Sequence, residues 1–332
     1  MKDIARELGV SIITVSKVLR NHDDIGEKTR QRVLDKVREM NYTPNLAARS
    51  LVTGRTYLVG LVVPDLMHTF FAQIARSLSA ALLRKGYCLT ISTSEEDPEV
   101  EARTIARLLA RRLDALVIAS AATASPALAK ALEDGPPLVL VDRQFPGLAA
   151  NYVGTDDEAV GRLAAEHLLA TGCLRIAHLR GPDTSGGRGR LEGYQQALAA
   201  HGLTLPAGYV SAPGTADVHS LESGQQLASE LLALCPRPDG IFAFNDAMAI
   251  GAMRAIREAG LRIPEDVAVI GAGNLYYSEE LRTPLSSIDQ RTEETGERVA
   301  ELLLSLLEAK TAPLPKSILV EPQLIVRASS QR

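Results

Sequence analysis

The chain has 332 residues, of which 46% are hydrophobic and 23% are charged, and its formal net charge is −4. This length is sufficient for two or three domains with a substantial core. The sequence has no apolar run long enough to cross a bilayer and begins without the apolar segment of a signal peptide, so we expect a cytoplasmic protein with no membrane partner. Cys88, Cys173 and Cys235 are scattered, which predicts free, buried thiols and argues against a disulfide framework or a metal site.

The charge is unevenly distributed along the chain. Residues 1–56 contain 11 Lys and Arg against 7 Asp and Glu, a net +4, whereas the remaining residues contain 25 against 33, a net −8. A basic segment on an acidic body suits a protein whose N-terminal part meets the phosphates of a nucleic acid. Because the excess is only four charges, it supports this interpretation without deciding it.

The N-terminal residues 2–19 predict two short helices around a tight turn. Gly9 is placed to end the first helix with a positive φ, and Ser11 is placed to cap the second, over residues 12–19. The side chains expected on the buried faces are Ile4, Ala5, Leu8, Val15, Val18 and Leu19. This pattern is typical of a helix-turn-helix, although an ordinary αα-hairpin has the same two-helix pattern.

A third amphipathic helix is predicted over residues 27–40, with Val33, Val37 and Met40 on its buried side. From here the sequence resembles the LacI/GalR (lac repressor) family of bacterial transcription regulators. The motifs that carry the resemblance are VSIITVS at 10–16, YTPN at 42–45, ARSL at 48–51, TGRT at 53–56 and VGLVVPD at 59–65. Several motifs in a fixed order are far more specific than a lone helix-turn-helix.

The resemblance implies that the second helix contacts base edges in the major groove, with Ile12, Ile13 and Lys17 at base-facing positions. The family usually has polar or small residues at the first two positions and Arg at the third. Isoleucine offers only apolar contacts, and Lys lacks the guanidinium fork, so no known operator sequence transfers to this chain. The expected phosphate contacts are Thr14, Ser16, Asn21 and Thr29. For Thr14 and Ser16 the alternative is ordinary polarity of a helix surface.

Residues 45–52 resemble the family's hinge helix, which forms when two subunits sit on the operator. The residues implied in DNA contact are Asn45, Ala48, Arg49 and Leu51, with Leu51 as the apolar wedge in the minor groove. So short a helix, flanked by Pro44 and Gly54, would be marginal alone, which favours folding on binding. The alternative is that Leu51 is a core residue of a permanent helix.

From residue 57 onward, apolar runs alternate with amphipathic helices. Strands are predicted over 58–63, 87–93, 115–119, 138–141, 176–179, 240–244, 267–271 and 285–288, and helices over 71–85, 98–111, 158–171, 191–201, 220–234 and 246–259. Repeated βα units predict parallel sheets covered on both faces. The family resemblance implies a periplasmic-binding-protein-like α/β body of two Rossmann-like lobes, with chain crossings near 151–156, 286–290 and 320–323.

The sequence therefore predicts an all-α helix-turn-helix DNA-binding headpiece (1–44), a hinge helix and linker (45–56), and an effector-binding and dimerisation domain (57–332). Within this domain we expect an N-lobe at about 57–153 and 289–320. The C-lobe is expected at about 154–288 and 321–332.

Ligands of such sheets bind where the strands end at the inter-lobe cleft. The strand ends and the family's R-x-x-G-aromatic and F-N-D motifs indicate these effector contacts: Asp65, His68, Phe71, Asp142, Arg143, Arg190, Asn245, Asp246, Asn274 and Gln290. Arg190 is the first choice, because the resemblance places it in the cleft. Phe71 has core packing as its alternative, and Asp246 has capping of the helix after it. Residues 181–188 match no phosphate-binding motif and are expected to form a flexible approach to Arg190.

Two departures from the family pattern bear on the effector. His68-Thr69 stand where an Asn-Pro pair is usual, and Gly273 stands where an acid is usual. A polar cleft favours a sugar, and Arg143 with Arg190 tilts the choice toward an anionic sugar acid. A purine is the alternative.

The resulting prediction is a homodimeric regulator, most simply a repressor, that binds a pseudo-palindromic operator under allosteric control by this ligand. A sugar-binding transport protein would share the body but should lack the helix-turn-helix. No catalytic triad, metal-ligand spacing or paired-carboxylate motif is recognisable, so neither an enzyme nor a cofactor is expected.

Overall fold

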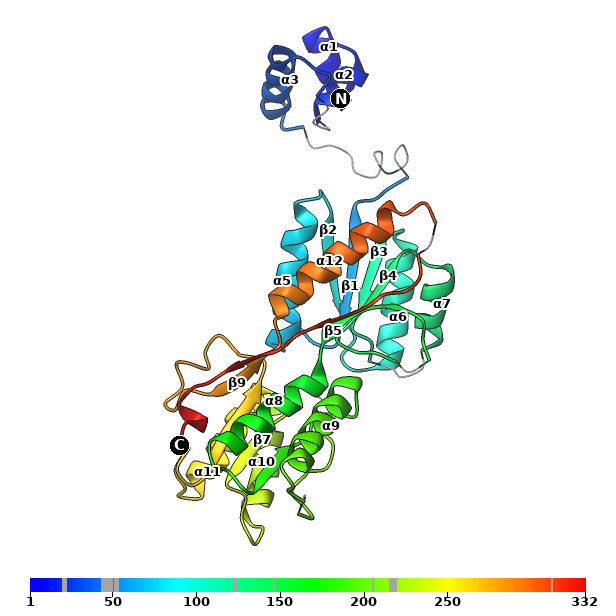
Figure 1. Cartoon of the computed structure of the whole chain (residues 1–332). Coiled ribbons are helices and arrows are strands. Elements are labelled where there is room, and N and C mark those ends of the chain that lie inside the picture. The colour runs from blue at the N-terminus through cyan, green and yellow to red at the C-terminus, as the bar shows by residue number, and fades with distance from the viewer. Residues whose placement is uncertain are drawn as a thin grey trace. The chain divides into compact units, whose positions relative to one another are not determined.

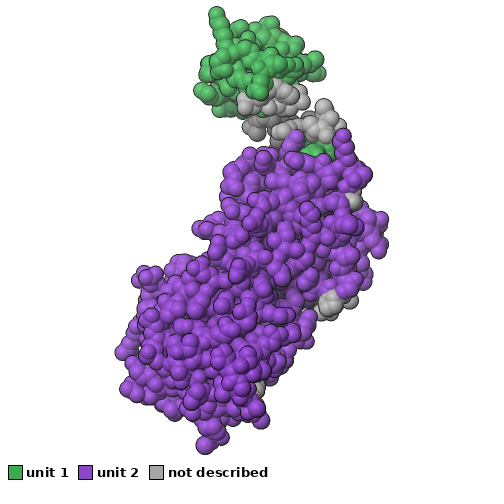
Figure 2. Space-filling view, in the orientation of Figure 1, with its two compact units in different colours: residues 1–56 green, residues 57–332 purple. Residues whose placement is uncertain are grey.

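The computed structural model describes residues 1–19, 23–42, 50, 54–121, 125–145, 147–204, 206–214, 220–311 and 313–332. The chain forms two compact units, Met1–Thr56 and Tyr57–Arg332, which are coloured separately in Figure 2. Each unit has its own hydrophobic core. The two units are described separately below.

The headpiece contains the three predicted helices, α1 (Lys2–Leu8), α2 (Ile12–Leu19) and α3 (Glu27–Glu39). Gly9 ends α1 with φ +65°, and the Ser11 hydroxyl accepts the Thr14 N–H at 3.0 Å, so both local signals are confirmed. The buried core consists of Ile4, Ala5, Val15, Val18 and Val33. Met40 was expected on the buried side, but it follows the last turn of α3 and is 38% exposed.

The body consists of two sheets with helices on both faces, as predicted (Figure 1). The first sheet is entirely parallel, in the order β10-β5-β4-β3-β1-β2. Its strands are β1 (Leu58–Val63), β2 (Cys88–Thr93), β3 (Ala115–Ile118), β4 (Leu138–Val141), β5 (Asn151–Thr155) and β10 (Ser317–Val320). Its helices are α5 (Thr69–Leu83), α6 (Pro98–Ala110), α7 (Pro126–Asp134) and α12 (Thr292–Glu308).

The second sheet has the order β11-β9-β8-β7-β6, and only β11 runs antiparallel to its neighbour. Its strands are β6 (Ile176–Leu179), β7 (Gly240–Ala243), β8 (Ala268–Ala272), β9 (Ser286–Asp289) and β11 (Gln323–Ile325). Its helices are α8 (Asp157–Ala170), α9 (Ser185–Ala200), α10 (Ser220–Leu232), α11 (Asp246–Glu258) and the 3₁₀ turn Ala328–Ser330. The chain passes between the sheets after β5, after β9 and after β10.

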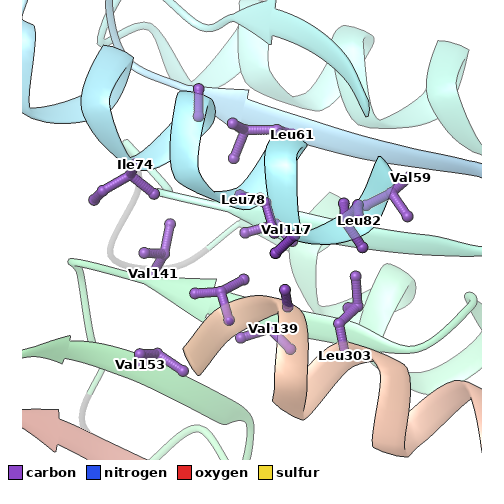
Figure 3. Close-up of a cluster of buried hydrophobic side chains, with 14 of the residues drawn as sticks. Val59, Leu61, Ile74, Leu78, Leu82, Val117, Val139, Val141, Val153 and Leu303 are labelled. Carbon is purple, nitrogen blue, oxygen red and sulfur yellow. The ribbon is translucent and has the colours of Figure 1, made fainter. Parts of the chain in front are cut away.

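The core of the first lobe follows from strand register. Leu61 lies beside Val117 and Val117 beside Val139 in neighbouring strands, so their side chains form one apolar row. Leu78 of α5 and Leu303 of α12 pack on that row, as Figure 3 shows. Helices α6 and α7 cover the opposite face of the sheet. In the second lobe, α8 and α9 cover one face, and α10 and α11 cover the other.

Some elements differ from the sequence prediction. Strands β5, β10 and β11 were not foreseen, because they are short and polar or half-exposed. The segment expected as a flexible approach to Arg190 is helical from Ser185, because the Thr184 hydroxyl accepts the Gly187 N–H at 3.2 Å and caps α9. Of the three free cysteines only Cys173 is buried, so the prediction of buried thiols was wrong for the other two.

Candidate functional site

The outer side of α2 carries two exposed isoleucines. Val15 and Val18 face the headpiece core, so the helical period turns Ile13 outward and leaves Ile12 at the edge of the buried face. Their exposed fractions are 44% and 67%. This helix presents an apolar contact surface flanked by polar side chains, as expected for a helix that meets thymine methyl groups.

The polar side chains around these isoleucines have partners within the headpiece. The Lys17 ammonium forms an ion pair with Asp24, and the Thr14 hydroxyl lies 2.9 Å from the Ser11 hydroxyl. Ser16 and Thr29 are half-buried. The other predicted DNA contacts lie outside the described residues: Asn21, Asn45, Ala48, Arg49 and Leu51.

In the C-lobe, the Arg190 side chain extends from α9 to the residue that follows β7. Its Nε donates to Asp157 Oδ1 at 2.9 Å, and its Nη1 donates to the Phe244 carbonyl at 2.5 Å. Its guanidinium carbon lies 4.4 Å from the centre of the Phe244 ring, a cation–π geometry. Burial raises the pKa of the Asp157 carboxyl, and the neighbouring Arg190 charge opposes that shift. Each charge of this buried pair is therefore stabilised by the other.

Glycines bring the two helices of this pair together. A Cβ at Gly161 of α8 would lie 1.9 Å from the Arg190 carbonyl oxygen, and one at Gly193 of α9 would lie 1.9 Å from the Glu158 carbonyl oxygen. Only glycine permits this approach. These glycines of α8 and α9 thus position Arg190 against Asp157.

In the N-lobe, Arg143 is also paired. Its guanidinium makes a two-pronged contact with Glu96, at 2.7 and 2.6 Å, and its Nε lies 3.8 Å from Asp142. Behind it, the buried Glu101 carboxylate accepts the Ser120 hydroxyl and the Ala121 N–H, each at 2.6 Å. Burial raises the pKa of Glu101, and these two hydrogen bonds oppose that shift. Three strand ends, those of β2, β3 and β4, contribute to this cluster.

The capping role considered for Asp246 belongs to Asn245. The Asn245 side chain, not Asp246, caps α11, because its Oδ1 accepts the Met248 N–H at 2.8 Å. Asp246 is 1% exposed and accepts the Ser287 hydroxyl at 2.6 Å and the Leu275 N–H at 2.8 Å. Burial raises the pKa of Asp246 to about 6, although its hydrogen bonds oppose the shift. Asp246 therefore stabilises the segment after β8.

Three of the remaining predicted effector contacts are engaged in local structure. Asp65 accepts the Met67 N–H at 2.9 Å. Phe71 is 2% exposed and belongs to the lobe core, so core packing, the alternative, is what the structure shows. Gln290 is buried at a crossing, where its main-chain carbonyl accepts the Thr155 hydroxyl at 3.2 Å. His68 differs, because its Nδ1 is buried and has no hydrogen-bond partner among the described residues.

Two cavities lined by described residues lie between the lobes. One, of about 600 Å³, is bordered by Asn274 and Asp289 of the C-lobe, by Gln73 and Arg76 of α5, and by Thr292 and several charged side chains of α12. The other, of about 680 Å³, lies between the segment after β4 and the start of α9, which includes Ser185. Asn274 is the predicted effector residue that lines the first cavity.

The structure joins two predicted residues through a shared partner and places a third close to a fourth along the chain. Arg190 binds the carbonyl of Phe244, the residue before Asn245. Asn274 and Asp246 meet at Ser287, whose hydroxyl accepts the Asn274 N–H at 2.9 Å and donates to Asp246.

Sequence reasoning missed Glu96, Asp157 and Asp289 as members of this region. Glu96 and Asp289 stand at the carboxyl ends of β2 and β9, so the strand-end rule that selected the other residues would have found them. For Asp157 the only signal is its place in the first turn of α8.

A helical DNA-binding headpiece joined to a two-lobed α/β body with ligand-sized cavities between its lobes defines a class of protein, the ligand-controlled transcription regulators. Residues 1–45 match the family model described as bacterial regulatory proteins, lacI family, and residues 165–330 match that of the periplasmic binding protein-like domain.

Related sequences and solved structures indicate the same class of protein. The chain is 32% identical to the transcriptional regulator DegA of Bacillus subtilis, covering 99% of this chain and 97% of DegA. It is 31% identical to the ribose operon repressor of Escherichia coli, covering 99% of each. The lac repressor dimer bound to operator and the anti-inducer ONPF superimposes with a TM-score of 0.84 at 28% identity, over 99% of this chain and 98% of that one.

The chain belongs to the LacI family of bacterial regulatory proteins, which confirms the resemblance noted in its sequence. It is a DNA-binding transcription regulator with an effector-binding body, and the relatives named above are regulators. In the described part of the chain, no helix is both long enough and apolar enough to span a membrane.

Proposed function

We propose that this regulator is a homodimeric repressor whose binding to a pseudo-palindromic operator is controlled by an uncharged sugar held between the lobes. The observation that carries the proposal is the pairing of two buried arginines, Arg143 and Arg190, with carboxylates. Arg143 is matched by Glu96 and Asp142, and Arg190 is matched by Asp157.

These ion pairs favour a neutral ligand over an anionic one. An anionic sugar acid would have to displace carboxylates that already bind the arginines, or approach them against their charge. The sequence predicted an anionic sugar acid because of these two arginines, but the carboxylates around them do not support that prediction. An uncharged sugar both donates and accepts hydrogen bonds, which suits carboxylates and amides held in place.

The relatives support a sugar over a purine. A ribose operon repressor is 31% identical to this chain, and a structure described as a CelR–cellobiose complex superimposes with a TM-score of 0.76. A PurR repressor of Mannheimia succiniciproducens is 30% identical, so the purine alternative has a relative as well. Purines bind well against an exposed aromatic face. Phe71 is buried, however, and Phe244 is covered by Arg190.

The second chain crossing, after β9, connects the cleft to helices of the first lobe. Just after β9, the Thr292 hydroxyl donates to Gln73 at 2.8 Å, and Glu293 binds Arg76 at 2.6 Å. Both partners belong to α5. A ligand that changes the angle between the lobes would therefore move α5, and we propose that this movement reaches the hinge residues of two subunits.

The proposal also covers the DNA contacts, the compartment and the absence of turnover. Ile12, Ile13 and Lys17 would contact bases, and Leu51 would act as the minor-groove wedge. We place the protein in the cytoplasm, where operator DNA lies, and expect bound sugar to be released unchanged.

The test is a thermal-shift and calorimetric screen of the full chain. The panel contains uncharged sugars, sugar acids, sugar phosphates and purines, and operator DNA is obtained by selection from a random pool. We expect an uncharged sugar to bind and to change operator affinity. Binding of sugar acids or purines alone would contradict the proposal.

A further inference from the structure

We infer that Asp289 is the carboxylate that accepts a sugar hydroxyl at the end of the cleft formed by β8 and β9. This inference rests on the proposed control by an uncharged sugar. The first observation is the register of the two strands. Ala272 lies beside Ile288, and the Gly273 N–H donates to the Ile288 carbonyl at 2.8 Å. Gly273 and Asp289 therefore leave neighbouring strands at the same level.

Gly273 leaves room in front of β8. A Cβ built at this position would meet nothing closer than the Asp246 carboxylate, 3.7 Å away. Its φ of +130° also lies in a region that residues with a side chain rarely adopt. The space that an acidic side chain would occupy at Gly273 is open, and Asp289 lies one strand away.

The other two polar residues at this edge are already occupied. Asp246 is almost fully buried, with hydrogen bonds to Ser287 and Leu275. The Asn274 Nδ2 donates to Asp289 Oδ2 at 3.1 Å, and its Oδ1 accepts from Arg327 Nη2 at 2.8 Å. These contacts fix the orientation of the Asn274 amide and hold it against Asp289.

Asp289 is both oriented and accessible. Its Oδ1 accepts the Arg291 N–H at 2.7 Å, and its Oδ2 accepts the Asn274 amide. Each carboxylate oxygen has a second lone pair, so two acceptor positions remain. Asp289 is half-buried and borders the 600 Å³ cavity. A carboxylate fixed in this way makes a strong, charge-assisted hydrogen bond to a hydroxyl donor.

The opposite wall supplies the complementary group. Gln73 of α5 borders the same cavity, and its Oε1 accepts the Thr292 hydroxyl at 2.8 Å. This bond turns the amide so that its NH₂ group remains as a donor. Adjacent hydroxyls of a sugar would donate to Asp289 and accept from Gln73. This end of the cleft therefore recognises a ligand with at least two adjacent hydroxyls.

The test compares the full chain with Asp289→Asn and with Asp134→Asn. Asp134 is an exposed residue of α7 outside the cavity and serves as the matched control. The calorimetric probes are D-ribose, D-glucose, D-galactose and cellobiose, followed by the monodeoxy derivatives of whichever sugar binds. Because asparagine is isosteric and its carbonyl still accepts the Arg291 N–H, we expect the ligand-free protein to remain folded.

For the parent sugar we expect Asp289→Asn to weaken binding roughly 10- to 100-fold, the usual loss for a hydrogen bond to a charged group. For one deoxy derivative, the wild type and the variant should bind equally, because the hydroxyl that Asp289 binds is missing. An unchanged affinity, or an equal loss on every derivative, would overturn the inference. If no uncharged sugar binds the wild type, the proposed function fails and the inference fails with it.

Discussion

Removing the Asp157 carboxylate tests whether this ion pair holds Arg190 in place. Arg190 is 4% exposed and Asp157 is 12% exposed, so Asp157→Ala leaves a guanidinium buried without its counter-charge. Breaking a buried pair in this way usually costs roughly 3–5 kcal/mol. Arg190 keeps the Phe244 carbonyl and ring, so we expect the lower end, roughly 3 kcal/mol. For a domain of this size that corresponds to a melting temperature lower by roughly 5–10 °C.

The assay is thermal unfolding of the ligand-free chain at neutral pH. The matched control is Glu166→Ala on the same helix, because Glu166 pairs with Arg162 at 4.0 Å and the two side chains are 42% and 47% exposed. An exposed pair of this kind contributes roughly 0–1 kcal/mol, so the control should melt near the wild type. Asp157→Asn keeps an acceptor for Arg190 Nε but loses the charge, and we expect it to fall between the two.

Equal melting temperatures for Asp157→Ala and Glu166→Ala would refute the reasoning, because they would show that Arg190 does not depend on a buried counter-charge. A second measurement separates stability from orientation. At a temperature where Asp157→Ala is fully folded, its affinity for the sugar identified in the screen should still be reduced, because Arg190 has lost the carboxylate that orients its Nε.

Three further predictions follow from the described contacts. Asp24→Asn should strengthen binding to nonspecific duplex DNA roughly 3- to 10-fold at low salt, because it frees Lys17 and removes a negative charge. The measurement is a gel-shift titration with Asp134→Asn as control. A gain in affinity that persisted at high salt would contradict this electrostatic explanation. Arg190→Ala should abolish the response to sugar while ligand-free DNA binding stays near normal, and a collapse of DNA binding would make Arg190 structural. Because burial raises the pKa of Asp246 to about 6 from its ordinary 3.8, its protonated form stabilises the fold, and this contribution is lost as pH rises from about 4 to about 6. Asp246→Asn should therefore flatten the decline in denaturant stability over that range, and an unchanged slope would exclude Asp246 as its source.

The sequence by itself determined the headpiece and most of the sheet strands. Gly9 and Ser11 end and begin helices through contacts within a few residues, so α1 and α2 follow from local chemistry. Strands such as β1 are continuous apolar runs, because both faces of a parallel sheet are covered. The order of the family motifs similarly indicated two lobes and a cleft.

Only the tertiary structure decided which charges are paired and which strands complete the sheets. β5 and β10 carry Gly, Asn or exposed residues, and pairing with a neighbour makes them strands. Arg143 meets Glu96 across 47 positions of sequence, and Arg190 meets Asp157 across 33. The crossovers bring these strand and helix ends together, and this proximity cannot be predicted from the spacing of residues along the chain. In the sequence, the two arginines indicate two positive charges. The fold places carboxylates against them, so the topology decides the net charge around these side chains.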